Sequence, residues 1–360
     1  MGSLSQIDQP RDESPPPPVT AEGSEAASVP APLPQVAERT TRASRLSLAT
    51  ASFFLSGLAF ALLAVLMVFW PGPLAEETTA VIPRGASVRE IAALLEGQGV
   101  LSNTFVFRGI ARAVAADNLH AGEYRFTPGM RALDVVLMLR DGRSITRRFT
   151  VVEGLTSHDI AALVRDDSAL SGDLDAIPPD GEILPETYNF NYGDSRSGLM
   201  ERMRKGQRDL LDGLWANRAT NLPLKTPQEA VVMASLIEKE TGKKPDERAR
   251  VAGVFYNRLR LGMRLQSDPT VIYALTKGQG PLGRDLSHAD LATPSPFNTY
   301  VNAGLPPQPI CNPGRAALEA ALHPEEHDFL YFVADGTGGH AFAKTLSQHN
   351  QNVARWLALP

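Results

Sequence analysis

The stretch VVMASLIEKETG at residues 231–242 combines an apolar helical stripe with two glutamates at its end. Positions 232, 233, 236 and 237 follow the three-and-four spacing of one buried helix face. Glu240 continues that face, whereas Glu238 lies on the opposite side, where we expect it to be solvated. Desolvation on the buried face raises the pKa of a carboxyl group toward the range of a general acid. Glu240 is therefore a candidate general acid; the alternative is an amphipathic helix end whose glutamate reaches solvent.

The composition excludes several classes of function. The chain has 360 residues, a formal net charge of −5 and one cysteine, Cys311. It lacks the global basic character of nucleic-acid-binding proteins, so no nucleic acid partner is expected. The lone cysteine cannot form an internal disulfide, and no Cys/His cluster has zinc-ligand spacing. His340 and His349 alone suggest a metal pair, but a third ligand is not evident, so we expect neither a metal nor a cofactor.

The N-terminal part predicts a membrane anchor. Residues 1–45 are predicted to form a disordered tail, rich in Pro, Ser and Ala. Residues 46–70, from Leu46 to Trp70, form an uncharged apolar run long enough to span a bilayer, and too long for a signal peptide. Basic residues precede the run and acidic residues follow it (Arg39, Arg42 and Arg45; Glu76 and Glu77). The positive-inside rule therefore predicts a single-pass protein of the cytoplasmic (inner) membrane, with a cytoplasmic N-terminus and an extracytoplasmic, periplasmic remainder.

A strand–turn–helix pattern occurs twice after the anchor. The sequence RGASVREIAAL at 84–94 resembles EGLTSHDIAAL at 153–163, and a short β-like run precedes each copy. Each copy contains a capping box, Ser87 with Glu90 and Thr156 with Asp159. With a strand at 121–126 and a helix at 132–139, we divide this part into a module at 78–150 and a domain at 151–360 that begins with the second copy. Such β-α units serve as binding modules or as structural spacers.

The rest of the chain predicts alternating helices and loops. Helices are expected at 199–214 and 245–259, and a short one follows with Asp268 as its N-cap and Pro269 in its first position. Residues 278–314 are dense in Pro and Gly, and so long a loop is usually functional. A buried strand at 329–334, a glycine-rich turn and a helix at 346–357 complete the pattern. The predicted fold class is α+β, with an N-terminal transmembrane helix, β-α modules and a mixed α/β domain.

Ordered motifs in the chain resemble the YceG-like, or MltG, family of membrane-anchored endolytic murein transglycosylases. From about Val81 to the end they are ASLIEKET at 234–241, VFYNRL at 254–259, MRLQSDPT at 263–270, NTY at 298–300, GLPP at 304–307, LYFV at 330–333 and GHAF at 339–342. One departure is LPETY at 184–188, where the family usually has Phe-Pro-Asp-Thr-Tyr. The resemblance implies that 78–150 is a LysM-like module and that 151–360 is a catalytic domain with a lytic-transglycosylase-like helical active site.

The resemblance also implies an activity. It assigns Glu240 as the catalytic residue of a lyase that cleaves the β-1,4 bond between N-acetylmuramic acid and N-acetylglucosamine in nascent peptidoglycan. Glu240 would protonate the glycosidic oxygen and then deprotonate the muramyl 6-hydroxyl, which leaves 1,6-anhydro ends and helps to terminate strand elongation. One carboxyl group suffices because an internal hydroxyl replaces the water of ordinary glycosidases. The implied partners are glycan strands and, through Leu46–Trp70, the bilayer; cell-wall synthases are candidates.

Four further residues are candidates for substrate binding. Gln266 and Asn298 carry amides suited to sugar hydroxyl and acetamido groups, although such amides also satisfy loop backbone. Tyr300 and Tyr273 are suited to stacking on sugar rings, although aromatic side chains beside apolar residues also belong to cores.

Two acidic residues are candidate neighbours that tune Glu240 without touching substrate. The first is Glu238, which alternatively is a solvated glutamate with no effect on Glu240. The second is Asp268, which alternatively serves only as a helix N-cap. Two other functions stay open at this point, a non-catalytic peptidoglycan-binding scaffold and a hydrolytic muramidase. Loss of cleavage with retained binding in a Glu240 variant would separate an enzyme from a scaffold, and the chemistry of the product ends would separate a lyase from a hydrolase.

Overall fold

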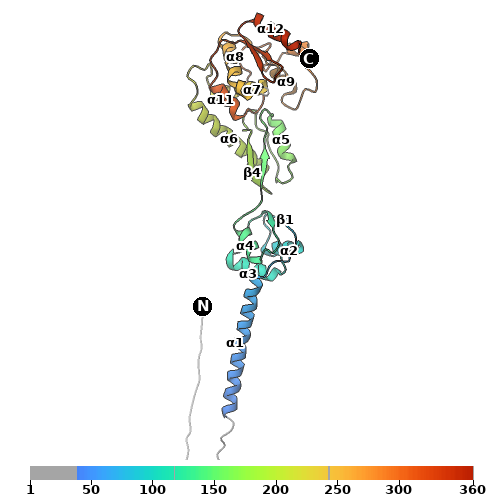
Figure 1. Ribbon diagram of the computed structural model, residues 1–360, viewed down its shortest axis with the longest axis vertical. Helices are drawn as coiled ribbons and strands as arrows, with labels where there is room; N and C mark the ends of the chain where they lie inside the picture. Colours follow the sequence, from blue (N-terminus) through green and yellow to red (C-terminus); the bar gives the residue numbers. More distant parts are fainter. Residues whose placement is uncertain (1–38, 117, 242–243, 360) are drawn as a thin grey trace, which may run out of the picture. The chain divides into compact units, whose positions relative to one another are not determined.

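The computed structural model describes residues 39–116, 118–241 and 244–359, and it has the predicted mixed α+β character (Figure 1). Most of the predicted tail, residues 1–38, lies outside the described residues. Helix α1 (Arg39–Phe69) begins before the predicted residue 46, so residues 39–45 are helical and do not belong to a tail. Its segment Thr50–Phe69 has a mean hydropathy of 2.4 and is, by length and composition, capable of crossing a membrane. Residues from Val65 onward form one compact unit.

The first β-α unit folds around an antiparallel strand pair. Strands β1 (Thr78–Ile82) and β2 (Gly122–Phe126) pair with Ala80 opposite Tyr124. Helices α2 (Val88–Gly97) and α3 (Thr104–Val114) lie between them in sequence, and α4 (Ala132–Arg140) follows. The strands and helices share one hydrophobic core, which includes Ile82, Ile91, Leu95, Phe107, Tyr124 and Leu139.

The predicted repeat is confirmed in its local geometry. Strand β3 (Thr146–Thr150) leads into α5 (Ser157–Asp166) as β1 leads into α2, and both helices begin with the predicted capping box. Gly85 and Gly154, in the two turns, both have φ of 78°, a left-handed conformation that favours glycine. The continuation differs, because β3 pairs with β4 (Thr187–Asn191) after a single helix. Helix α6 (Arg196–Ala216) follows β4.

Helix α7 (Pro227–Glu240) is the centre of the helical part of the chain, between α8 (Arg248–Arg260), α9 (Asp268–Thr276) and α11 (Arg315–Leu322) (Figure 1). Every residue from Ala230 to Ile237 is buried. The prediction of a single buried face was therefore incomplete, because α7 is enclosed all round in the manner of a core helix.

The remaining elements are short. A 3₁₀ turn (Pro245–Glu247) precedes α8, α10 (His288–Leu291) lies in the long Pro/Gly-rich segment, and β5 (Tyr331–Ala334) pairs with β6 (His340–Ala343) before α12 (Leu346–Leu357). The predicted fully buried strand at 329–334 is only half-buried, and Ala334 is exposed, because β5 belongs to a two-stranded hairpin.

One buried amide joins segments that are far apart in the sequence. Asn312 donates from Nδ2 to the carbonyl of Leu155 and to Ser157 Oγ, both at 3.1 Å. Its Oδ1 accepts from the backbone N–H groups of Gly181 at 2.9 Å and Ile183 at 3.0 Å. Asn312 is fully buried, and the N–H groups of Gly181 and Ile183 depend on its side chain for a partner.

We expect Asn312→Ala to lower the free energy of unfolding by about 2–4 kcal/mol, because it leaves the buried N–H groups of Gly181 and Ile183 unsatisfied. The thermal unfolding midpoint of the full chain, followed by circular dichroism in neutral detergent, measures the effect. Asn189→Ala is the control, since Asn189 is exposed on β4, and we expect a change within about 0.5 kcal/mol. Equal midpoints for the two variants would contradict the assigned role of Asn312.

Candidate active site

Glu240 is the last residue of α7, at the point where that helix leaves the core. Thr226 caps the start of α7 and Pro227 occupies its first turn. At the other end, Thr241 has extended backbone angles, and its hydroxyl donates to the carbonyl of Ile237 at 2.6 Å. The negative end of the helix dipole therefore lies beside the Glu240 carboxyl and favours its neutral form.

The Glu240 carboxyl is partly buried, and Ser267 donates from Oγ to its Oε1 at 2.6 Å. Burial raises the pKa of Glu240, and the charge of Asp268 acts in the same direction. The Ser267 hydrogen bond opposes this rise in pKa, as do the positive charges of His340 and Arg258 to a smaller extent. The balance leaves the pKa of Glu240 above its ordinary value, which suits a general acid.

Ser267 is a site residue that sequence reasoning missed. It, and not the predicted Asp268, is the N-cap of α9, and Asp268 is the first helical residue. Ser267 is 1% exposed, and its side chain makes no capping hydrogen bond because it donates to Glu240. Its backbone N–H donates to Thr299 Oγ1 at 3.0 Å, which ties the segment before α9 to the Pro/Gly-rich loop. A serine directly before Asp-Pro was the available signal, since serine is a favoured N-cap.

Arg258 is a second missed residue, and it lies within the VFYNRL motif. Its guanidinium is buried, and it donates from Nε to the carbonyl of Leu330 and from Nη1 to that of Leu265, both at 2.7 Å. It also lies over the ring of Tyr331, 5.2 Å from the centroid. Arg258 thus joins the segment before Ser267 to β5 and places a positive charge near Glu240.

His340 and His349, the pair that the sequence suggests as metal ligands, have different partners. His340 Nδ1 lies 2.8 Å from Glu247 Oε2, and both side chains are nearly enclosed. His349 stacks on Tyr331 with ring centroids 5.2 Å apart. Among the described residues no group of His, Cys, Asp and Glu side chains is arranged to hold a metal ion.

The structure brings Tyr300 and Asp268 together near Glu240. The Tyr300 hydroxyl donates to Asp268 Oδ1 at 2.6 Å, and both residues interact electrostatically with Glu240. Asp268 is exposed and Tyr300 is partly buried. Burial and the Asp268 carboxylate raise the pKa of Tyr300, so its hydroxyl stays protonated.

The predicted amides have different surroundings. Gln266 is exposed, has a left-handed φ of 53°, and its side chain makes no hydrogen bond within the described residues. Asn298 is fully buried, and its Nδ2 donates to the carbonyls of Leu291 and Thr293 at 3.1 and 2.9 Å. Its Oδ1 accepts from the backbone N–H of Tyr300 at 2.9 Å, so the amide of Asn298 bonds the backbone of its own loop.

Tyr273 lies on α9, beside the site. Its hydroxyl donates to Asp180 Oδ2 at 2.6 Å, and its ring packs against Phe297 at 4.9 Å between centroids. It also lines a cavity of about 580 Å³ together with Pro269 and Lys239. These two residues adjoin Asp268 and Glu240 in the sequence, which places Tyr273 at the border of the site.

The expectation that Glu238 is solvated was wrong. Its side chain is 8% exposed, with Oε1 3.5 Å from Arg248 Nη2. Its Oε2 accepts from the backbone N–H of Gly314 at 3.0 Å, at the N-terminus of α11. A second helix therefore covers the face that the local pattern left open, and Glu238 serves packing on that side of α7.

Comparisons with known proteins find similar sequences over most of the chain. The model of the YceG-like family matches residues 80–355. An endolytic murein transglycosylase of Bacillus subtilis (strain 168) is 33% identical over 309 residues, covering 77% of this chain and 84% of that protein. One of Streptococcus pneumoniae serotype 2 is 30% identical over 325 residues; the alignment covers 77% of this chain and 58% of the streptococcal protein. A crystal structure of a yceG-like protein from Listeria monocytogenes is 32% identical, covers 77% of this chain and 99% of that chain, and has a TM-score of 0.46.

We expect Ser267→Ala to move the alkaline limb of the pH profile of peptidoglycan cleavage to higher pH. A general acid acts in its protonated form, so the rate falls as pH rises through its pKa. The Ser267 hydrogen bond favours the carboxylate, and its loss therefore raises the pKa of Glu240 further. Profiles of kcat/KM measure the shift. Ser235→Ala is the control, because Ser235 is buried and its hydroxyl donates to the carbonyl of Val232; we expect this variant to keep the alkaline limb of the wild-type profile. An alkaline limb at the wild-type pH in Ser267→Ala would contradict the role of Ser267 in setting the pKa of Glu240.

Proposed function

The chain belongs to the YceG-like family, and on that premise we propose that it is an endolytic murein transglycosylase that cuts the glycan strands of peptidoglycan. The observation that carries the proposal is the Glu240 carboxyl at the end of the core helix, with a raised pKa and a hydrogen bond to Ser267. Its relatives from Bacillus and Streptococcus carry that activity in their names.

The proposed chemistry uses Glu240 as acid and then as base. The protonated carboxyl gives its proton to the glycosidic oxygen as the bond from that oxygen to the muramyl C1 breaks. The resulting carboxylate takes the proton of the muramyl 6-hydroxyl while that oxygen bonds to C1 and closes the 1,6-anhydro ring. Glu240 ends the cycle protonated, and no water is consumed.

The surroundings of Glu240 support both steps. Ser267 holds Oε1, and within the described residues Oε2 has no hydrogen-bond partner, which leaves it for the travelling proton. Burial and Asp268 favour the acid before the first step. The Ser267 hydroxyl stabilises the carboxylate that forms after it.

Substrate contacts are proposed for three residues that lie near Glu240 or border its site, Gln266, Tyr300 and Tyr273. The Gln266 amide is exposed on a backbone with a left-handed φ of 53°, and such strained conformations cluster at functional sites. Tyr300 and Tyr273 border the site and are suited to sugar rings, while Asp268 acts through Tyr300 and through its charge. Asn298 positions the loop that carries Tyr300.

The proposed domain organisation places this chemistry at a membrane. Thr50–Phe69 would anchor the chain in the cytoplasmic membrane, and the preceding arginines support an extracytoplasmic catalytic domain at 151–360. Residues 78–150 would be a LysM-like module, supported by the order β1, α2, α3, β2 with an antiparallel strand pair. Cell-wall synthases are the partners that this setting favours.

We expect Glu240→Gln to lower peptidoglycan cleavage by about 10²–10⁴-fold, because the same group serves as acid and as base. Glu238→Gln is a matched control two residues away: its amide oxygen can still accept from Gly314, and we expect activity within about tenfold of wild type. Release of soluble fragments from purified glycan strands measures both. Sedimentation with the same strands should show unchanged binding by Glu240→Gln. Full activity in that variant would exclude the proposed mechanism.

The second candidate function is a hydrolytic muramidase, because the Asp268 carboxylate near Glu240 supplies a second acidic group. The chemistry of the product ends separates this hydrolase from a lyase. We expect mass spectrometry to find 1,6-anhydromuramyl ends, which are about 18 Da lighter than hydrolysed ends because no water is added. Cleavage in ¹⁸O-labelled water provides the control, since a lyase incorporates no label. Reducing ends carrying ¹⁸O would establish hydrolysis in place of the proposed reaction.

A further inference from the structure

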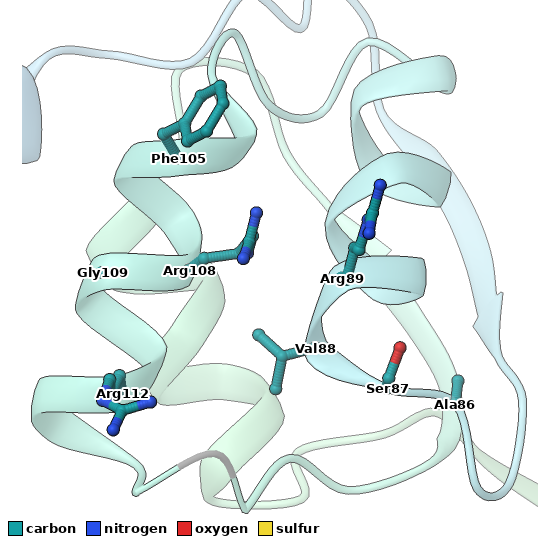
Figure 2. A pocket seen from close by; sticks show the side chains of 8 residues that line it. All are labelled: Ala86, Ser87, Val88, Arg89, Phe105, Arg108, Gly109 and Arg112. Atoms are coloured by element: carbon teal, nitrogen blue, oxygen red, sulfur yellow. The ribbon is translucent and has the colours of Figure 1, made fainter.

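A cavity of about 640 Å³ lies between α2 and α3 in the first β-α unit, far in sequence from Glu240 (Figure 2). Val88 occupies the space between the two helices, and Arg89 borders it from α2. From α3, Arg108 reaches toward α2, and Arg112 borders the cavity one turn further along. The proposed glycan chemistry uses none of these residues.

The three arginines around the cavity are exposed and make no ion pair within the described residues. The other arginines of this unit behave differently. Most of them have a carboxylate partner: Arg125 pairs with Glu77, Arg131 with Asp134, Arg140 and Arg143 with Asp141, and Arg147 with Glu123. Like charges that converge on one cavity repel each other, and a bound anion would relieve this repulsion.

Gly109 supplies space at this cavity. It lies in the interior of α3, where glycine is a poor helix former, and it lines the cavity beside Arg108. A Cβ at Gly109 would meet nothing within 4 Å, so packing against the rest of the chain does not require a glycine here. A larger side chain at this position would occupy the space between the guanidinium groups.

Phe105 gives the same cavity an apolar rim. Its side chain is 77% exposed, the highest exposure of any large apolar residue described after α1. The Arg108 guanidinium lies 5.9 Å from its ring centroid. Aromatic rings beside arginines are typical of surfaces that meet the interfacial region of a bilayer.

The cavity belongs to the first β-α unit, which directly follows the apolar helix α1 in the sequence. Val68, near the end of α1, packs against the core of this unit, and the Phe69 ring lies 5.7 Å from the Arg131 guanidinium. The backbone of Gly72 donates to the carbonyl of Met130 at 3.1 Å. These contacts come from residues 68–72, so the first β-α unit begins directly after the segment that would leave the bilayer.

We infer that the cavity between α2 and α3 binds the phosphate head group of an anionic membrane lipid. Arg89, Arg108 and Arg112 would receive the phosphate, since guanidinium groups match phosphate oxygens in charge and in hydrogen-bond geometry. Phe105 would enter the interfacial region beside the head group. The inference rests on the proposed membrane anchor, and it gives the first β-α unit a lipid ligand in addition to any glycan.

The test uses the full chain in neutral dodecyl maltoside, mixed with phosphatidylglycerol or with phosphatidylcholine of the same acyl chains. Native mass spectrometry counts the lipid that each protein retains. We expect wild type to retain phosphatidylglycerol at least about tenfold over phosphatidylcholine, and R89Q/R108Q/R112Q to lose that preference. The variant R125Q/R140Q/R143Q removes the same charge from the same unit and keeps the preference. G109L removes no charge and lowers the preference by filling the cavity.

Several outcomes would overturn the inference. The first is equal retention of phosphatidylglycerol and phosphatidylcholine by wild type, and the second is an equal loss of the phosphatidylglycerol preference in the two triple variants. The third is displacement of the bound lipid by an equal concentration of inorganic phosphate. Arginine-dependent retention of a soluble muropeptide in place of the lipid would assign the cavity to the glycan. Failure of the anchor is distinct, because it would appear as extraction of the chain from membranes by alkaline carbonate. Failure of the proposed enzyme would appear in the cleavage assays alone.

Discussion

The enclosure of α7 is the constraint on which the candidate site depends. Because α8, α9 and α11 pack around α7 and residues 230–237 are buried, a tilt or rotation of the helix would disturb the core that supports its last carboxyl. When a carboxyl group is supported by a packed core, a change in its protonation state requires little reorganisation of its surroundings. Ser267 and Arg258 reach the same edge from the chain that follows, so the site is assembled on the end of one buried helix.

Local patterns predicted much of the fold. The capping boxes at Ser87 and Thr156 and the helix at 346–357 were all found, because caps and periodicity are short-range signals. The position of Glu240, partly buried at the end of α7, also agrees with the sequence pattern, since its place on the apolar stripe is local. The surroundings of Glu238 and Ser267 were not, because Arg248, Gly314 and Glu240 reach them through tertiary packing. A helix face that looks polar in the sequence can thus be covered by an element from elsewhere.

Two sets of charged residues in the chain have different physical roles. Around α7, Arg258, Glu247 and Glu238 are buried and engaged with specific partners, and such groups hold elements together because leaving them unpaired is costly. Around the cavity between α2 and α3, the guanidinium groups are exposed and unpaired within the described residues. Exposed charges of one sign contribute little to stability and much to the attraction of an opposite charge.

The contacts of Asn312 also determine when the site can exist. Its amide reaches back 157 residues to Leu155, and His340, whose charge affects Glu240, lies further still along the chain. The capped β-α units can form from local contacts while the chain is still being synthesised, since short-range structure forms early. The environment of Glu240 must wait for contacts of high sequence separation. A partly synthesised or truncated chain therefore carries the carboxyl without its surroundings, and cleavage of the wall is confined to molecules that have been completed.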